Sequence, residues 1–230
     1  MKLARLTAFL SFASLVFSAE TVTDTNGEGE YAVQMPQVYD GYEKNLQNCK
    51  AMGSGWDLPT IWELFSTPHT IVSKGEKSLY ASSTSIPANG DEIYYFSFEN
   101  KDVNTVKKTE NLYSVCIKKS DKKPTPPHER VKWLQPERER QEYQAAVKVC
   151  ENKGGRLPSI EELFSLALAK VQDEDGFRSK YGFMQPKYYW SKDGNDDFSN
   201  TALVSGFLKA SVANNPKNNK SFVRCVTDGR

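Results

Sequence analysis

The side chains that most often carry catalysis are scarce in this sequence. Its two histidines, His69 and His128, lie in no spacing such as HExxH that would hold a catalytic zinc ion. The Gly-Ser-Gly of residues 53–55 lacks the GxSxG pattern of a nucleophile elbow, and no glycine-rich phosphate loop is present. Glu161 and Glu162 are adjacent, so on a helix they would point in different directions. The sequence favours a protein without catalytic residues or a cofactor.

The best candidate for a metal site is the stretch DGNDD, which begins at Asp193. Asp193, Asn195 and Asp197 alternate as the oxygen ligands of calcium do. An EF-hand loop starting here would need glycine at its sixth position and glutamate at its twelfth, where the sequence has Phe198 and Val204. Residues of these types also form polar turns between strands. We therefore expect a turn, and we assign no metal ligand.

Aromatic residues are the other candidates for ligand contact. Alternation along a strand would place Tyr94, Phe96 and Phe98 on one face, where they would pack in a core. Core packing is also the expectation for Trp190. Exposed rings can instead stack on a sugar or anchor a protein partner. The candidates for such a contact, if exposed, are Tyr95, Tyr188 and Trp56.

Export is predicted by residues 1–19, in which two basic residues precede an apolar run that ends in small residues, as in a signal peptide. The run is shorter than the ~20 residues that span a bilayer, so we expect no integral membrane segment after cleavage. The cysteines form no CxxC pair, and their even number in an exported chain favours disulfide bonds over metal binding. They are Cys49, Cys116, Cys150 and Cys225.

Charge and length limit the class of protein further. The chain has 30 basic and 29 acidic residues, and the predicted signal removes two basic ones, Lys2 and Arg5. The mature protein would thus be close to neutral, which argues against nucleic acid as a partner. The remaining length fits two domains of ~100 to 150 residues each.

An internal duplication defines these two domains. The sequence LPTIWELFS at residues 58–66 recurs as LPSIEELFS at residues 157–165. Each copy contains the S/T-x-x-E capping box that starts a helix. Pro68 is expected to end the first of these helices early, whereas the second should run to about Lys170.

Other matching segments complete each half. YEKNLQNC, from Tyr42, matches YQAAVKVC, from Tyr143, and its spacing places Tyr, an aliphatic residue and Cys on one helical face. YASS matches YWSK, and YSVCI matches FVRCV, both at an offset of 109 residues; all four have the composition of strands. EIYYFSFE and ALVSGFLKASV lie between them as further strand candidates. Each half is therefore expected to be α+β, with two helices followed by a small, mostly antiparallel sheet.

The duplication also selects one of the three ways to pair four cysteines. Each half has one cysteine on its first helix and one in its last strand. We therefore predict disulfides from Cys49 to Cys116 and from Cys150 to Cys225. On a chain-entropy argument each bond would stabilise its domain by up to about 4 kcal/mol.

The expected boundaries follow from composition. The two domains cover residues 31–118 and 131–230, and residues 20–30 are polar enough to be disordered. Residues 119–130 are rich in lysine and proline and form a semi-rigid linker. A polybasic contact with anionic lipid or polysaccharide is the alternative for this linker. Short charge runs are usually just solvated, which favours a hinge.

The second half resembles a bacterial domain family named for the C-terminal domain of a collagen-like adhesin. CENKGGRLPSIEELFSL, YYWSKDG and SFVRCV carry this resemblance, over residues 136–228. Residues 36–118 are similar as a divergent copy, with Asp57 where arginine is common and Ala81 in place of the tryptophan. The resemblance implies two tandem C-type-lectin-like domains, a fold related to that of formylglycine-generating enzymes, and binding of other molecules in the envelope or outside the cell.

Three functional hypotheses follow. The leading one is a non-enzymatic protein of a Gram-negative cell envelope, periplasmic or secreted to the cell surface. Its tandem domains would bind or scaffold envelope or periplasmic proteins, for example in a flagellar, secretion or appendage assembly. The alternative is a carbohydrate-binding adhesin or lectin with a glycan as partner, although lectin-type calcium motifs are missing. A redox or sulfatase-maturation enzyme would need free thiols in an open cleft.

Overall fold

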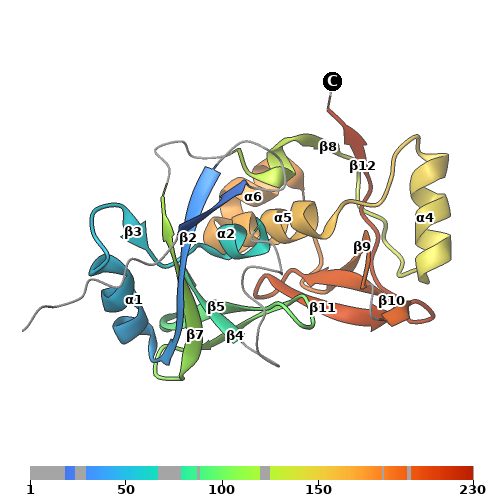
Figure 1. The fold of residues 1–230 in the computed structure, drawn as a ribbon. Helices are drawn as coiled ribbons and strands as arrows, with labels where there is room; N and C mark the ends of the chain where they lie inside the picture. The colour runs from blue at the N-terminus through green and yellow to red at the C-terminus, as the bar shows by residue number, and fades with distance from the viewer. Residues whose placement is uncertain are drawn as a thin grey trace, which may run out of the picture.

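The computed structural model describes residues 19–23, 30–66, 79–86, 89–119, 125–182, 184–195 and 198–229. This part of the protein is α+β, with helices packed on a mostly antiparallel sheet (Figure 1). The predicted signal peptide lies outside it, apart from Ala19. None of the described helices has the length and apolar character needed to cross a membrane.

The first copy contains β1 (Ala19–Thr23), β2 (Glu30–Asp40), α1 (Tyr42–Lys50), β3 (Trp56–Asp57), α2 (Ile61–Ser66), β4 (Leu79–Ile86), β5 (Asn89–Ser97), β6 (Asp102–Lys107) and β7 (Leu112–Lys118). The second contains η1 (Pro127–Glu129), β8 (Val131–Trp133), α4 (Tyr143–Asn152), α5 (Ile160–Gln172), α6 (Glu174–Tyr181), β9 (Tyr188–Asn195), β10 (Phe198–Gly206), β11 (Ser211–Pro216) and β12 (Val226–Asp228). One sheet has the order β1-β2-β7-β4-β5-β6-β11-β10-β9, with β3 beside β7, and β8 pairs with β12.

Both predicted capping boxes are present. The Thr60 hydroxyl accepts a hydrogen bond from the Glu63 backbone N–H, and the Glu63 carboxylate accepts one from the Thr60 N–H. Ser159 and Glu162 repeat this exchange at the start of α5. Each box satisfies two backbone donors that have no partner inside the helix. The duplicated nonamer is therefore a helix start in both copies.

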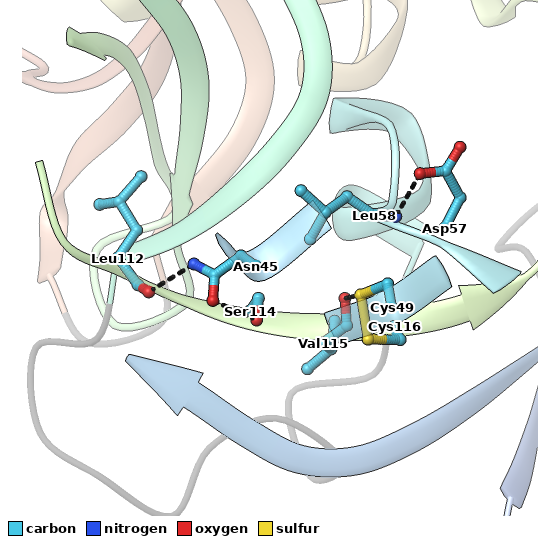
Figure 2. The surroundings of a disulfide bond; sticks show 8 residues. All are labelled: Asn45, Cys49, Asp57, Leu58, Leu112, Ser114, Val115 and Cys116. Atoms are coloured by element: carbon cyan, nitrogen blue, oxygen red, sulfur yellow. Dashed lines mark hydrogen bonds between the residues drawn. A yellow bond between two sulfur atoms is a disulfide. The ribbon is translucent and has the colours of Figure 1, made fainter. Parts of the chain in front are cut away.

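The predicted disulfides are present in the structure. Cys49 is bonded to Cys116 and Cys150 to Cys225, so each bond joins the first helix of a copy to its last segment. Figure 2 shows the first bond between α1 and β7. Beside it, the Asn45 amide donates to the Leu112 carbonyl oxygen at 3.0 Å. Covalent and polar contacts thus fix the same helix to the same strand.

The strand prediction fails in two segments of the second copy. FVRCV forms no continuous strand, because Phe222 makes only an isolated bridge, residues 223–225 are in no strand and β12 begins at Val226. ALVSGFLKASV was expected to be one strand, but its residues 207–210 form the turn between β10 and β11. Ala210 lies at the end of this turn with a φ of 49°. Lys101, at the equivalent position between β5 and β6, has a φ of 54°. The residue types contain no Asn-Gly or Asp-Gly signal for a hairpin, which is why the turn was missed.

The two copies are joined more closely than two domains on a hinge. The largest cluster of buried hydrophobic residues includes Ile61 and Tyr94 of the first copy and Leu163, Phe164 and Phe207 of the second. The sheet also continues from β6 into β11 (Figure 1). The expectation of two self-contained units is therefore corrected: each copy has its own disulfide, but they share one core.

The linker prediction is wrong for the part of residues 119–130 that packs on the second copy. Pro127 begins the short 3-10 helix η1, and His128 is buried against α5. The His128 backbone N–H donates to the Ser165 hydroxyl at 3.3 Å, and its imidazole Nδ1 also forms a hydrogen bond with that hydroxyl. A buried contact of this kind holds the chain in place. Residues 120–124 lie outside the described part.

The predicted disorder of residues 20–30 is also corrected in part. Residues 19–23 form β1, which pairs antiparallel with β2 from Ala19 opposite Gln34 to Thr23 opposite Glu30. Alternating threonine and valine suit a strand even though the segment is polar. Residues 24–29 lie outside the described part of the chain.

Candidate functional site

An open groove on the second copy has the features of a binding site. It has a volume of about 550 Å³ and lies where the start of β9 meets β11 and residues 219–222. Its polar and aromatic lining includes Arg140, Lys187, Tyr188, Asn215, Asn219 and Lys220. We call this site the Tyr188 groove.

Tyr188 is the aromatic wall of this groove. Its side chain is 46% exposed, one of the few large hydrophobic groups of the described residues that reach solvent. The ring lies over Gly206, where an added Cβ would come within 3.0 Å of the Tyr188 Cε1 and 2.6 Å of the Ser211 Oγ. Glycine at position 206 therefore leaves the space that the ring occupies, and the ring has a defined place on the sheet.

Amide side chains form the polar wall. The Asn219 Nδ2 donates to the Asn215 Oδ1 at 2.8 Å, and the Asn215 Nδ2 donates to the Ser221 Oγ at 3.0 Å. This series of hydrogen bonds fixes the orientation of both amides. Side chains that are already ordered lose less conformational entropy when they bind a partner.

The backbone around residue 222 connects the groove to the core of the second copy. Phe222 N–H donates to the Tyr188 carbonyl at 2.9 Å, and Trp190 N–H donates to the Phe222 carbonyl at 3.0 Å. The Trp190 indole donates to the Gln141 carbonyl at 2.8 Å and its side chain is fully buried. Trp190 thus supports the groove from below and cannot touch a ligand in it.

The groove is electropositive. Arg140, Lys187 and Lys220 are exposed on its rim, and the described residues that line it include no acidic side chain. Three cations around one concave surface raise the local concentration of negatively charged groups and orient them. The groove can therefore bind an anionic ligand that also offers a flat or apolar surface to Tyr188.

No known protein family and no curated protein matches this sequence. The resemblance of the second half to the adhesin C-terminal domain family thus stays a prediction.

The other two aromatic candidates lie elsewhere. Trp56 is half-buried beside the Cys49 disulfide, packed against Leu58 and its neighbours. Tyr95 is half-buried against Ile93 and Ala81 in the first copy, and burial raises the pKa of its hydroxyl. Both rings therefore pack against their own copy, and of the three candidates only Tyr188 lines the groove.

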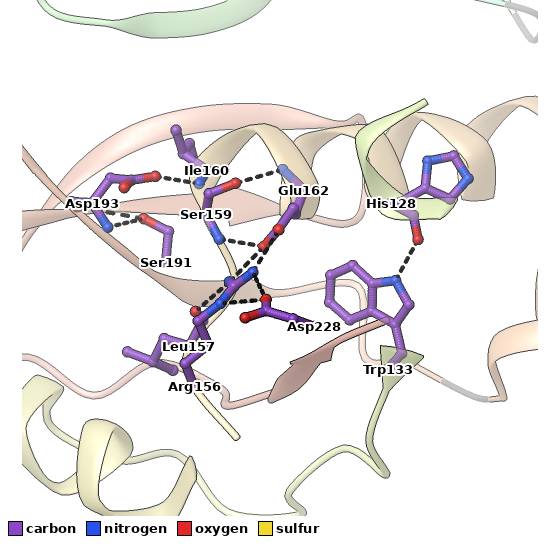
Figure 3. A network of polar contacts seen from close by, with 10 residues as sticks. All are labelled: His128, Trp133, Arg156, Leu157, Ser159, Ile160, Glu162, Ser191, Asp193 and Asp228. Carbon is purple, nitrogen blue, oxygen red and sulfur yellow. Dashed lines mark hydrogen bonds and ion pairs between the residues drawn. The ribbon is translucent and has the colours of Figure 1, made fainter. Parts of the chain in front are cut away.

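Asp193, the first residue of the candidate calcium stretch, stabilises the start of a helix. The Asp193 carboxylate accepts a hydrogen bond from the Ile160 N–H at 2.5 Å, at the start of α5 (Figure 3). Thr84, the equivalent residue of the first copy, accepts from the Ile61 N–H at 3.0 Å. Asp193 to Asn195 therefore belong to the end of β9 and not to a turn, and the same contact occurs in both copies. Within the described residues no three His, Cys, Asp or Glu side chains are grouped to hold a metal ion, and residues 196 and 197 lie outside them.

Charged residues around the second helix start form a network that also supports the fold. The Arg156 guanidinium donates to both oxygens of Glu162 at 2.9 Å and to the Asp228 carboxylate at 2.8 Å (Figure 3). Hydrogen bonds to Glu162 are the main cause that raises the pKa of Arg156 above its usual range. The first copy has Asp57 and Lys119 at the positions of Arg156 and Asp228. The positive charge is therefore before the helix in the second copy, at Arg156, and in the last segment of the first copy, at Lys119.

Only one of the two histidines lies in the described part of the chain. His128 is buried beside Ser165, and burial lowers its pKa to about 4. His69 lies outside the described residues. Sequence reasoning identified Tyr188, but it missed the amide wall, because asparagine near proline and lysine is typical of a simple turn.

Proposed function

We propose that this protein is a non-enzymatic binding protein of the bacterial cell envelope, and that its Tyr188 groove takes an acidic segment of another envelope protein. The single observation that carries the proposal is the groove itself, in which an exposed tyrosine is surrounded by three cations. Tyrosine and arginine are enriched in protein interfaces, where a ring supplies contact area at a low entropy cost. Opposite charge then sets the orientation and the association rate.

The covalent structure is compatible with this location. Two disulfide bonds are present, and such bonds persist in the periplasm and outside the cell. We propose that each copy is a C-type-lectin-like domain. The disulfide from first helix to last segment, the pair of helices that both copies share and the mostly antiparallel sheet support this assignment; the second copy adds a third helix, α6. A flagellar, secretion or appendage assembly is the proposed setting.

The proposal is tested by capture from envelope extracts after crosslinking. The bait is the mature protein, compared with a groove variant that carries Tyr188→Ala and Lys220→Glu. The matched control carries Leu208→Ala and Lys132→Glu, because both of these residues are exposed and lie outside the groove lining. We expect a protein that the wild type and the control capture and the groove variant does not. Equal capture by all three baits would contradict the role of the groove.

A carbohydrate-binding adhesin is the second candidate. The observation in its favour is the pairing of an aromatic ring with ordered amides, since sugars stack on rings and exchange hydrogen bonds with amides. A glycan array with neutral and acidic glycans, with and without calcium, separates the two candidates. Saturable binding to an acidic glycan that Tyr188→Ala abolishes would favour the lectin. Trp190 is unsuitable for this test because it is fully buried.

A further inference from the structure

A second cavity, separate from the Tyr188 groove, lies between η1, β8 and α6. Its volume is about 490 Å³. The side chains that matter here are His128, Trp133, Arg178, Lys180, Tyr181 and Arg224. None of them lines the Tyr188 groove. We call this cavity the Arg224 pocket.

Arg224 is a buried cation at this pocket. The residue is only 3% exposed. Its Nη2 donates to the Tyr181 carbonyl at 2.6 Å and its Nε donates to the Leu134 carbonyl at 3.2 Å. The guanidinium carbon lies 5.6 Å from the centre of the Trp133 ring. Within the described part of the chain Nη1 has no hydrogen-bond partner, and no carboxylate forms an ion pair with Arg224.

A buried guanidinium without a counter-charge is energetically unfavourable. Backbone carbonyls satisfy some of its donors but do not neutralise its charge, and buried charges are usually paired. Glu129 is the only carboxylate among the described lining residues, and it lies 3.1 Å from the Lys180 Nζ. Burial accordingly lowers the pKa of Arg224 to about 10. An anion that entered the pocket would supply the missing partner.

The fold itself does not require arginine at this position. The equivalent residue of the first copy, 109 positions earlier, is Val115, which is fully buried in the shared core. The first copy therefore fills the same place with an apolar side chain. Arg224 also has bonds to the Leu134 and Tyr181 carbonyls, and these do not explain its unpartnered Nη1.

Hydrogen bonds to neighbouring segments fix the Trp133 side of the pocket. The Trp133 indole donates to the His128 carbonyl at 2.8 Å, as Figure 3 shows, and His128 is fixed to Ser165 of α5. On the rim, the side chains of Arg178 and Lys180 are 57% and 61% exposed. Arg178 is paired with Glu174 at 3.4 Å and Lys180 with Glu129 at 3.1 Å, so the rim cations are partly neutralised. The pocket thus has one buried donor, two aromatic walls and a charged entrance.

We propose that the Arg224 pocket binds a small organic carboxylate, one oxygen of which accepts a hydrogen bond from the Arg224 Nη1. Arg224 has one unused nitrogen, which suits a singly charged carboxylate better than a phosphate that needs several donors. The rings of Trp133 and Tyr181 line the pocket beside Arg224, so the ligand also has an organic body. That body packs against the rings of Trp133 and Tyr181.

The test is an NMR titration of the mature protein with benzoate as the probe. Benzamide, which has the same shape without the charge, and inorganic phosphate are the comparison ligands. We expect saturable shifts of the Trp133 indole and Arg224 guanidinium signals with benzoate, at about 1 mM or below, and far weaker binding of the other two. Equal binding of benzamide, stronger binding of phosphate, or no shift with benzoate would each overturn the proposal.

Variants locate the binding. Arg224→Gln should remove benzoate binding, and its circular dichroism reports whether it folds. Arg178→Gln, on the exposed rim, should weaken binding by roughly threefold because that charge is screened. Arg138→Gln is the matched control, since Arg138 is exposed and outside the pocket, and it should bind as the wild type does. A folded Arg224→Gln protein that keeps the affinity would overturn the proposal. If the Arg224→Gln variant does not fold, unchanged benzoate binding by the Arg178→Gln variant would overturn the proposal.

Discussion

Val103 of the first copy and Val212 of the second pair directly with each other where β6 meets β11. They are equivalent positions, because the strands of the two copies match at an offset of 109 residues. Antiparallel pairing of equivalent residues is the arrangement of an isologous interface about a two-fold axis. Phe65 and Phe164 repeat this relationship between α2 and α5, with ring centres 5.3 Å apart. The duplicated chain is therefore packed like a two-fold dimer whose subunits are fused (Figure 1).

The shared core predicts that both copies unfold together. Phe164 is fully buried and contacts the rings of Trp62, Phe65 and Tyr94. Phe164→Ala should lower the free energy of unfolding by about 3 to 5 kcal/mol, because it leaves a cavity between the copies. Urea denaturation should show one transition, shifted as a whole. Leu208→Ala, at a residue that is 69% exposed, is the control and should change stability by less than about 0.5 kcal/mol. Two transitions, only one of which shifts, would contradict the shared core.

Because the two copies share one core, each disulfide should stabilise the whole protein against unfolding. Replacing Cys150 and Cys225 together by alanine should cost up to about 4 kcal/mol, since the unfolded chain gains freedom. Replacing Cys49 and Cys116 should cost nearly as much, because the two sequence separations, 75 and 67 residues, are similar. Denaturation of both variants, followed by circular dichroism, measures this. A large loss for one pair and none for the other would show that the copies are stabilised independently.

The exchanged charges at the helix starts predict a rescue. Arg156→Asp should destabilise the protein by roughly 2 kcal/mol, because Glu162 and Asp228 lose their common cation. Adding Asp228→Lys recreates the charge order of the first copy, in which Lys119 lies 3.8 Å from Glu63. The second change should restore at least about 0.5 kcal/mol in a double-mutant cycle. A double variant no more stable than Arg156→Asp would refute the equivalence of the two networks.

His128 predicts a pH dependence of stability. Burial, the largest cause, lowers its pKa to about 4 from 6.5; Glu129 raises the pKa and Lys180 lowers it. Between these values the unfolded chain binds a proton that the folded protein does not. The contribution of His128 is therefore complete above pH 6.5 and is lost as the pH falls toward 4, by roughly 2 kcal/mol.

The variant that tests this is His128→Gln, which does not titrate. Raised pKa values of Glu63 and Asp193 act in the opposite direction, but they are common to both proteins and cancel in the comparison. The difference in stability between wild type and variant, measured by urea denaturation from pH 7 to pH 4, should shrink as the pH falls. A constant difference would show that His128 is not buried as a neutral group.

The structural features that come from the duplicated segments could be predicted from the sequence. The capping boxes at Thr60 and Ser159 use side chains close in sequence, and the duplication determined the pairing of the cysteines. Both features depend on local spacing or on comparison of the halves. Tyr188 was a candidate only for its aromatic side chain and on the condition that it was exposed, which the structure shows.

Features that depend on contacts between residues far apart in the sequence, such as the packing of one copy against the other, could not be predicted. Phe65 and Phe164 each lie on an amphipathic helix, and such a pattern does not tell whether the apolar face meets its own copy or the other one. Arg224 lies in an apolar segment beside Cys225, where nothing local indicates that it lacks an anionic partner. His128 lies among prolines and lysines that are typical of a linker, and only the fold brings Ser165 to it.

The most direct test of the proposed function is photocrosslinking in the organism that makes the protein. A photoreactive amino acid is placed at Tyr188, in the groove, and separately at Leu208, which is exposed outside it. We predict a discrete adduct with one envelope protein from position 188 that is absent from position 208. Adducts that are the same from both positions, or none from position 188, would contradict the claim that the Tyr188 groove binds a protein partner.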